Sequence, residues 1–201
     1  MNFTPSTLAG LVVAASFAAG LNIYATVLTL GFLARLHWVE LPLGLEVLTN
    51  WWVIGVSAAL FSVEFFADKV PAFDLIWNAL HTFIRIPLAA LLAYRATLQL
   101  SPETQMLATV AGALIALAAH SSKTAARTLV TPSPEPVSNV ALSTGEDAVA
   151  VGLTWAAARH PWIAGCVAAA LTLAGILAAR WIVLAVSKTW KRLWQPQRAV
   201  S

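Results

Sequence analysis

The chain has 201 residues, of which 59% are hydrophobic and only 10% are charged, and its mean hydropathy is +0.77. Such a composition excludes an ordinary soluble domain and is typical of a protein that crosses a lipid bilayer several times. The net charge of +3 comes without a clustered basic patch, which excludes a surface for nucleic acid. The single cysteine, Cys166, excludes a disulfide framework and a thiolate metal site, and we expect no cofactor and no metal.

We therefore predict an all-α fold, a polytopic membrane protein of about six to seven short hydrophobic helices, some of them re-entrant or broken by proline. All 201 residues then belong to a single transmembrane domain. The chain starts without a basic region or a cleavage site, so we expect no cleaved signal peptide. By the positive-inside rule, the basic residues after the last apolar run predict a cytoplasmic C-terminus in the inner membrane; they are Lys188, Lys191, Arg192 and Arg198.

The first apolar run, residues 8–19, follows Thr4 and Pro5, which suit the N-cap and the first position of a helix. A second apolar run, residues 23–36, begins after an interruption that ends at Asn22. Each run is short for a full membrane span, whereas the two joined would exceed the thickness of the bilayer. We therefore predict a kink or a re-entrant hairpin with a polar tip at Asn22.

A third apolar run begins at Trp51 and Trp52, an aromatic pair that suits a membrane interface, and continues to residue 67. Near its end, Glu64 and Asp68 are four residues apart, so the two carboxylates share one face of the helix. Lys69 follows directly, and a nearby proline is expected to end the helix. This apolar segment therefore ends in a group of charges.

The next segment, residues 72–87, is predicted to be an amphipathic helix with one narrow polar stripe, and residues 88–99 extend its apolar character. The stripe consists of Asp74, Asn78, His81 and Arg85. Polar groups turned toward lipid tails would lose their hydrogen bonds, so we expect the stripe to face protein or a water-filled cavity. Arg85 should then lie within ion-pair reach of an acidic side chain.

The helix that follows carries His120, Lys123 and Arg127 at spacings that place them on one face. Prolines at positions 132, 134 and 136 remove backbone donors, so we expect this helix to end near Val130. Beyond it, residues 131–139 should form an ordered, non-helical loop packed inside the protein.

Ser143 and Glu146 have the spacing of a capping box, in which each side chain bonds the backbone amide of the other residue. A new helix is therefore predicted to begin near Ser143, with Asp147 in its first turn. The positive end of its dipole would point back toward the loop.

The second half of the chain resembles the first in places, which gives two candidate repeat halves, residues 4–67 and 101–187, joined by the amphipathic segment 70–99. For example, Gly145 opens an apolar run as Gly20 does. Alanine-rich helices also coincide by chance, so both explanations stay open. If the repeat is real, the interface between its halves is where transporters place their substrates.

Several motifs taken together resemble those of a known family. They are the turn Gly20-Leu21-Asn22, the pair Trp51-Trp52, the segment from Glu64-Phe65-Phe66-Ala67-Asp68-Lys69 to Thr82-Phe83-Ile84-Arg85, and the segment from Ser133-Pro134-Glu135 to Asn139 followed by Gly145-Glu146-Asp147. Over nearly its whole length the chain is similar to the family labelled domain of unknown function 4126. The resemblance implies an integral membrane protein, mostly bacterial in occurrence, and it supplies no activity.

Because an ionisable group at bilayer depth costs about 2.5 to 3.5 kcal/mol, the charges of residues 64–85 and 120–147 must be paired, hydrated or functional. We expect these two segments to meet in one polar centre, where their charges neutralise one another. The candidate substrate-binding residues are Lys123, Arg127, Arg85, Lys69, Asn139 and Asn22. The candidate proton-coupling or ion-pairing residues are Glu64, Asp68, Asp74, Glu135, Glu146, Asp147, His81 and His120.

These charges favour a transporter or translocator of a small anionic or phosphate-bearing substrate, with proton coupling through the carboxylates. In a lipid-phosphate flippase, the first alternative, the same cations would hold a headgroup. An intramembrane enzyme would pair Glu64 or Asp147 with His81 or His120 as acid and base, although no catalytic motif supports it. A scaffold subunit would use the charges only as ion pairs. The expected partners are the lipid bilayer and a small anion or lipid headgroup, with no nucleic acid; a homo-oligomer stays open.

Overall fold

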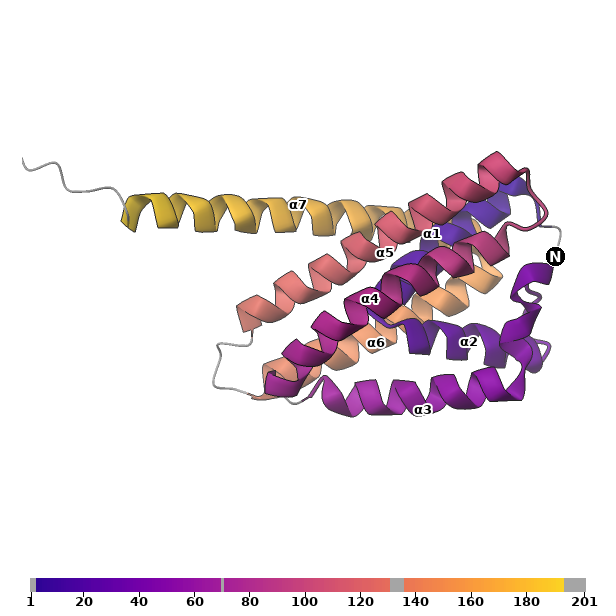
Figure 1. Ribbon diagram of the computed structural model, residues 1–201, viewed down its shortest axis with the longest axis horizontal. Coiled ribbons are helices and arrows are strands. Elements are labelled where there is room, and N and C mark those ends of the chain that lie inside the picture. The colour runs from indigo at the N-terminus through magenta and orange to yellow at the C-terminus, as the bar shows by residue number, and fades with distance from the viewer. Residues whose placement is uncertain (1–2, 70, 131–135, 194–201) are drawn as a thin grey trace, which may run out of the picture.

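The computed structural model describes residues 3–69, 71–130 and 136–193, and within them the fold is all-helical, as predicted. The elements are α1 (Pro5–Leu21), α2 (Ile23–Arg35), the 3-10 helix η1 (Leu43–Thr49), α3 (Trp51–Ala67), α4 (Pro71–Ala96), α5 (Pro102–Val130), α6 (Pro136–Arg159) and α7 (Pro161–Leu193). Figure 1 shows most of them gathered in one bundle, from which the end of α7 extends. Helix α5 reaches Val130 as expected.

Helix α1 is the centre of the bundle, where it contacts α4, α5, α6 and α7. Its sequence is apolar on every side, which is the pattern of a helix that is buried all round. The Thr4 hydroxyl accepts a hydrogen bond from the Thr7 amide at 3.3 Å and Pro5 starts the helix, so the predicted cap is confirmed. Helices α2, α4, α5, α6 and α7 therefore pack around an apolar helix.

The predicted interruption between the first two apolar runs is also confirmed. Asn22 has an extended backbone with φ −152°, and its amide donates to the Ala18 carbonyl at the end of α1. Its side-chain oxygen accepts from the Ala25 amide at 2.9 Å and so caps the start of α2. In Figure 1, α2 turns back from the end of α1, so that Asn22 lies at the tip of a bent helix pair.

Small residues allow the closest helix crossings. A Cβ atom added at Gly165 of α7 would lie 2.8 Å from the Cα atom of Gly10 in α1, which is too close for any side chain. A Cβ atom at Gly20 would lie 2.8 Å from the Cβ atom of Ala119 in α5. Close approach at small residues is how helices pack in lipid, where the hydrophobic effect does not drive them together.

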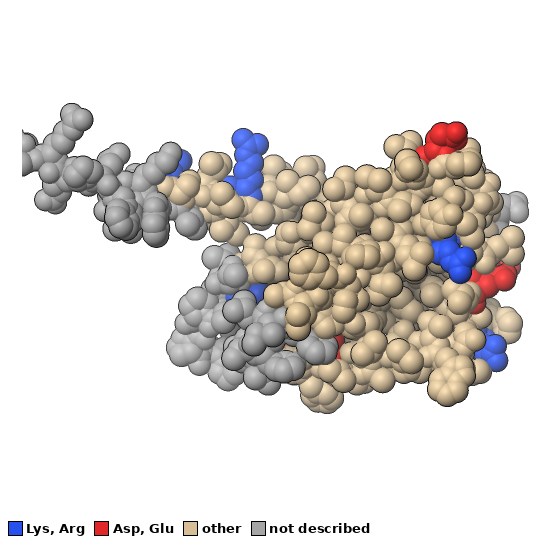
Figure 2. All heavy atoms as spheres, in the orientation of Figure 1, with Lys and Arg blue, Asp and Glu red and all other residues tan. Residues whose placement is uncertain are grey.

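By length and composition, two helices within the described residues can cross a membrane, Pro102–Arg127 and Pro161–Leu184. Leu43–Thr49 and Trp51–Ala67 meet the same criteria only together, as a pair bent by 68°. Large apolar side chains are exposed along the helices, among them Trp52 at 83% and Phe83 at 81%, and Figure 2 shows a face with few charged atoms. These features indicate a membrane protein whose outer surface contacts lipid.

The predicted helix start near Ser143 is wrong, because α6 begins at Pro136 and both Ser143 and Glu146 lie inside it. Pro136 occupies the first helical position, where its missing amide hydrogen costs nothing. The non-helical loop predicted for residues 131–139 is therefore wrong from residue 136 onward, and residues 131–135 lie outside the described residues. The repeat comparison also fails locally, since Gly20 precedes a helix break whereas Gly145 lies within a helix.

Candidate functional site

Segments far apart in the sequence bring their charges together inside the bundle. Helix α3 contributes two carboxylates near its end, α4 an arginine, α5 a lysine and an arginine, and α6 two carboxylates. We call these side chains the charge cluster; its members are Glu64, Asp68, Arg85, Lys123, Arg127, Glu146 and Asp147. Each is at most 9% exposed. The prediction that residues 64–85 and 120–147 meet in one polar centre is thus confirmed.

At one side of the charge cluster, Arg85 binds Glu64. The Arg85 Nη2 to Glu64 Oε1 distance is 2.5 Å, and both side chains are fully buried. The Nη1 atom of Arg85 lies 3.0 Å from Nδ1 of His120, whose Nε2 lies 2.7 Å from the Thr82 hydroxyl. A guanidinium only donates, so Nδ1 of His120 accepts and the ring proton sits on Nε2. His120 is therefore neutral and fixes the position of Arg85, which has the acidic partner that the polar stripe predicted.

At the centre, Lys123 and Arg127 share two carboxylates. Asp68 Oδ2 lies 3.0 Å from the Lys123 ammonium and 2.9 Å from Arg127 Nη2. Glu146 Oε2 lies 3.4 Å from the same ammonium and 2.6 Å from Arg127 Nη2. The Lys123 ammonium also donates to the Leu21 carbonyl, 3.2 Å away at the end of α1. These contacts tie α3, α5 and α6 to the broken helix pair.

Asp147 is bound by a neutral partner instead. Its Oδ1 atom accepts a hydrogen bond of 2.9 Å from the Asn22 side-chain amide, while Oδ2 has no hydrogen-bond partner among the described residues. Ser143 lies one turn earlier on α6, fully buried, and its hydroxyl likewise lacks a partner in the described part of the chain. Asp147 Oδ2 and the Ser143 hydroxyl, on one face of α6, can thus bind water or a ligand, and the carboxylate can bind a proton.

The charge cluster is not neutral. The residues that compose it are four carboxylates and three cations, so it has an excess of one negative charge when all are ionised. Among the described residues Lys69 forms no ion pair with it: its ammonium donates to the Phe65 carbonyl at 2.9 Å and lies 3.0 Å from the centre of the Phe65 ring, and its charge acts on Asp147 and Asp68 only from beyond ion-pair distance. A buried excess charge is costly, so the cluster is suited to binding a proton.

A family model with the description domain of unknown function 4126 matches residues 9–181. The chain belongs to this family. The match confirms the resemblance found in the sequence, and it covers every member of the charge cluster. No curated protein and no solved structure matches the chain.

For this member of the family, the structure places most but not all of the predicted site residues in one group. His81 is buried outside the charge cluster, where its Nε2 lies 3.1 Å from the Tyr24 hydroxyl. The side chains of Asp74, Asn78 and Asn139, together with the whole of Glu135, lie outside the described residues. Sequence reasoning missed Tyr24 and Thr82 and gave Ser143 only the role of a helix cap, because hydroxyl groups are common in membrane helices and only their surroundings distinguish them.

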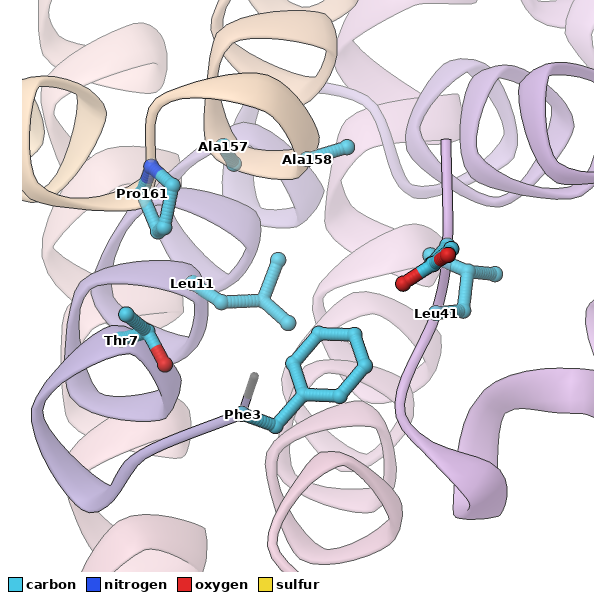
Figure 3. Close-up of a pocket in the computed structure, with 8 residues that line it drawn as sticks. Phe3, Thr7, Leu11, Leu41, Ala157, Ala158 and Pro161 are labelled. Carbon is cyan, nitrogen blue, oxygen red and sulfur yellow. The ribbon is translucent and has the colours of Figure 1, made fainter. Parts of the chain in front are cut away.

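Two pockets lie apart from these charges. A groove of about 390 Å³ between α2, η1, α3 and α4 is mainly apolar, with Tyr24 and Arg95 among its lining residues. A second pocket, at the start of α1, has Phe3 and Leu11 among its lining residues (Figure 3). At about 10 Å³ it has room for a single water at most, so we do not regard it as a substrate site.

Asn22 has two roles in the structure, and replacing it should reveal both. In Asn22→Ala, α2 loses its cap and Asp147 its amide donor, so we expect the free energy of unfolding to fall by about 2 to 3 kcal/mol. Asn50→Ala is the matched control, because Asn50 caps α3 through the Trp52 amide and is exposed. We expect it to cost about 1 kcal/mol. Denaturant titration in detergent would measure both, and equal losses would contradict the second role.

Proposed function

We propose that this protein carries a small anionic or phosphate-bearing solute across the inner membrane, coupled to protons. The charge cluster is its binding centre, in which Lys123, Arg127 and Arg85 attract the anion and the carboxylates exchange protons. The helices supply about six or seven membrane segments, with the C-terminus in the cytoplasm. We further propose that residues 4–67 and 101–187 are diverged repeats.

One observation carries this proposal: seven charged side chains are buried together between apolar helices. Buried ion pairs add little net stability, because the loss of hydration offsets their mutual attraction. Close crossings at small residues already hold these helices together, so packing alone does not explain the charges. Ionisable groups inside a membrane protein are more often part of a path for ions or solutes.

The helix break at Asn22 supports the same proposal. Transporters commonly bind their substrates where a membrane helix is interrupted, because the break exposes backbone groups to the site. Here the break lies against the charge cluster, with the Leu21 carbonyl bound to Lys123 and the Asn22 amide bound to Asp147. A small movement of α1 relative to α2 would therefore change the contacts of both residues.

Transport by the purified protein in proteoliposomes tests the proposal. The probes are radiolabelled phosphate, sulfate, pyruvate and gluconate, with a pH-sensitive dye in the lumen. We expect an inward proton gradient to drive the uptake of at least one probe, with acidification of the lumen, and a proton ionophore to abolish it. Empty liposomes are the control. Folded protein that moves none of these anions and no protons would contradict the proposal.

A lipid phosphate is a second candidate substrate, and the apolar groove favours it. The groove lies between membrane helices, and its volume of about 390 Å³ is within the range of ligand pockets. Tyr24 lines the groove and bonds His81 on α4, the helix that also carries Arg85. In this version an acyl chain occupies the groove while the headgroup reaches the cations. Exposure of a fluorescent phosphatidate to external dithionite would report its transfer between leaflets.

A further inference from the structure

We infer that the carboxylate of Glu146 occupies the anion-binding site in this structure, and that the anion replaces it when Glu146 takes up a proton. The inference rests on the proposed function and names its substrate class, a small monovalent oxyanion. Glu146 therefore acts as an internal competitor for Lys123 and Arg127. Anion binding is then coupled to proton uptake by Glu146.

The contacts of Glu146 are those that a bound oxyanion would make. A single oxygen, Oε2, accepts from Arg127 Nη2 at 2.6 Å and from Arg127 Nε at 3.2 Å. The Lys123 ammonium lies 3.4 Å from the same oxygen. A guanidinium edge with an ammonium beside it is well suited to a carboxylate or a phosphate group. A ligand oxyanion in this position would meet the same donors.

Glu146 is the carboxylate in the charge cluster that can leave most readily. It is 9% exposed, against 0% for Glu64 and Asp68 and 5% for Asp147. Glu64 is bound to Arg85. Asp68 lies between both central cations, and its side chain taken alone is 1% exposed. Asp147 has no cation within ion-pair distance among the described residues, so its departure would free none.

The charges around Glu146 explain why a proton must accompany the anion. Lys123 and Arg127 face it from α5, Asp68 from α3, and Asp147 adjoins it on α6. Lys123 also lies 3.8 Å from Glu64, and Lys69 lies near the end of α3 without pairing with the cluster. Both central cations are already bonded to Asp68, so an added anion would deepen the excess of buried negative charge.

One proton restores the balance. Protonation converts the Glu146 carboxylate to a neutral acid, which releases Lys123 and Arg127 on that side, and a monovalent anion replaces the charge that was lost. The net charge of the cluster is then the same with and without substrate. The expected cycle takes up one proton with each monovalent anion, so it responds to a pH gradient and is insensitive to membrane potential.

The test compares Glu146→Gln with Glu103→Gln in proteoliposomes, with pyruvate and gluconate, which stay monovalent at neutral pH, as probes. Glutamine has the shape of the protonated acid and cannot exchange a proton. In Glu146→Gln we expect anion binding to be tighter than in the wild type at the same pH, because the internal competitor is gone. Uptake by this variant should not depend on the pH gradient. It should instead be driven by a membrane potential set with potassium and valinomycin. Glu103→Gln is the matched control, because Glu103 is exposed at the start of α5 and lies outside the charge cluster, and we expect it to keep uptake that depends on the pH gradient.

The outcomes separate the inference from the proposed function. If the wild type neither binds nor transports the probes, the proposed function fails. If the wild type transports a probe and Glu146→Gln keeps the pH dependence of the wild type, the inference is overturned. The same holds if Glu103→Gln loses the response to the pH gradient as Glu146→Gln does. Should Glu146→Gln fail to fold, Glu146→Asp takes its place: it retains a proton-accepting group, and uptake that ignores the pH gradient would overturn the inference.

Discussion

Replacing Lys123 with methionine is expected to reduce proton-driven anion uptake by about 10- to 100-fold, because a charge-assisted hydrogen bond contributes about 1.5 to 3 kcal/mol. Methionine has a similar length and no charge, so the change removes the ammonium that lies between Asp68 and Glu146. The measurement is the initial rate of phosphate or pyruvate uptake under an inward proton gradient. Arg127→Ala should have an effect of similar size, since Arg127 binds the same two carboxylates.

The single change also removes one of the two cations that Asp68 and Glu146 share, so the folded protein should lose about 3 to 5 kcal/mol of stability. The double variant Lys123→Met/Asp68→Asn separates the two effects, because it removes one cation and one carboxylate and keeps the net charge of the cluster. We expect it to recover most of the stability while uptake stays low. Recovery of uptake together with stability would mean that Lys123 has only a structural role.

Replacing Gly165 with leucine is expected to prevent the normal packing of α7 on α1. A Cβ atom at this position would lie 2.8 Å from the Cα atom of Gly10 and 3.2 Å from its carbonyl oxygen. Both atoms are backbone, so the neighbour cannot rotate away and the two helices must separate. Overpacking usually costs about 1 to 3 kcal/mol, and a rigid backbone contact belongs at the upper end. The thermal midpoint, read from tryptophan fluorescence in detergent, should fall by roughly 5 to 10 °C.

Gly152→Leu is the matched control for this prediction. Gly152 also lies inside a helix, α6, but a Cβ atom there would have no heavy atom within 4 Å. Leucine favours helix over glycine by about 0.5 to 1 kcal/mol, so the midpoint should stay level or rise slightly. A similar fall in both variants would show that the close crossing of α1 and α7 is not what makes Gly165 sensitive.

Local signals in the sequence predicted several helix boundaries correctly. Thr4 and Pro5 mark the start of α1, and Asn22 marks its end, because a side-chain cap and the fixed φ of proline act over a few residues. The polar stripe of α4 likewise predicted an acidic partner for Arg85, since a buried guanidinium without one would be too costly. These predictions needed no knowledge of the neighbouring helices.

The same local reasoning failed at Ser143 and Glu146. Their spacing matches a capping box, yet both lie within α6, and Glu146 binds Arg127 of another helix instead of a backbone amide. A carboxylate gains more from a buried guanidinium than from a cap that the helix does not need, because α6 already begins at Pro136. A short motif therefore gave the wrong structure where a contact from a distant helix was stronger.

The amino-acid sequence by itself determined that the protein is helical, that it belongs in a membrane, and which two segments carry charges that have to neutralise one another. The tertiary structure alone decided which charges pair, that Asp147 is held by Asn22, and that Glu146 lies between Lys123 and Arg127. The reason is physical: composition and periodicity set the cost of burying each group, whereas pairing depends on distances of a few ångströms. Those distances depend on close helix crossings such as that of Gly20 in α1 with Ala119 in α5.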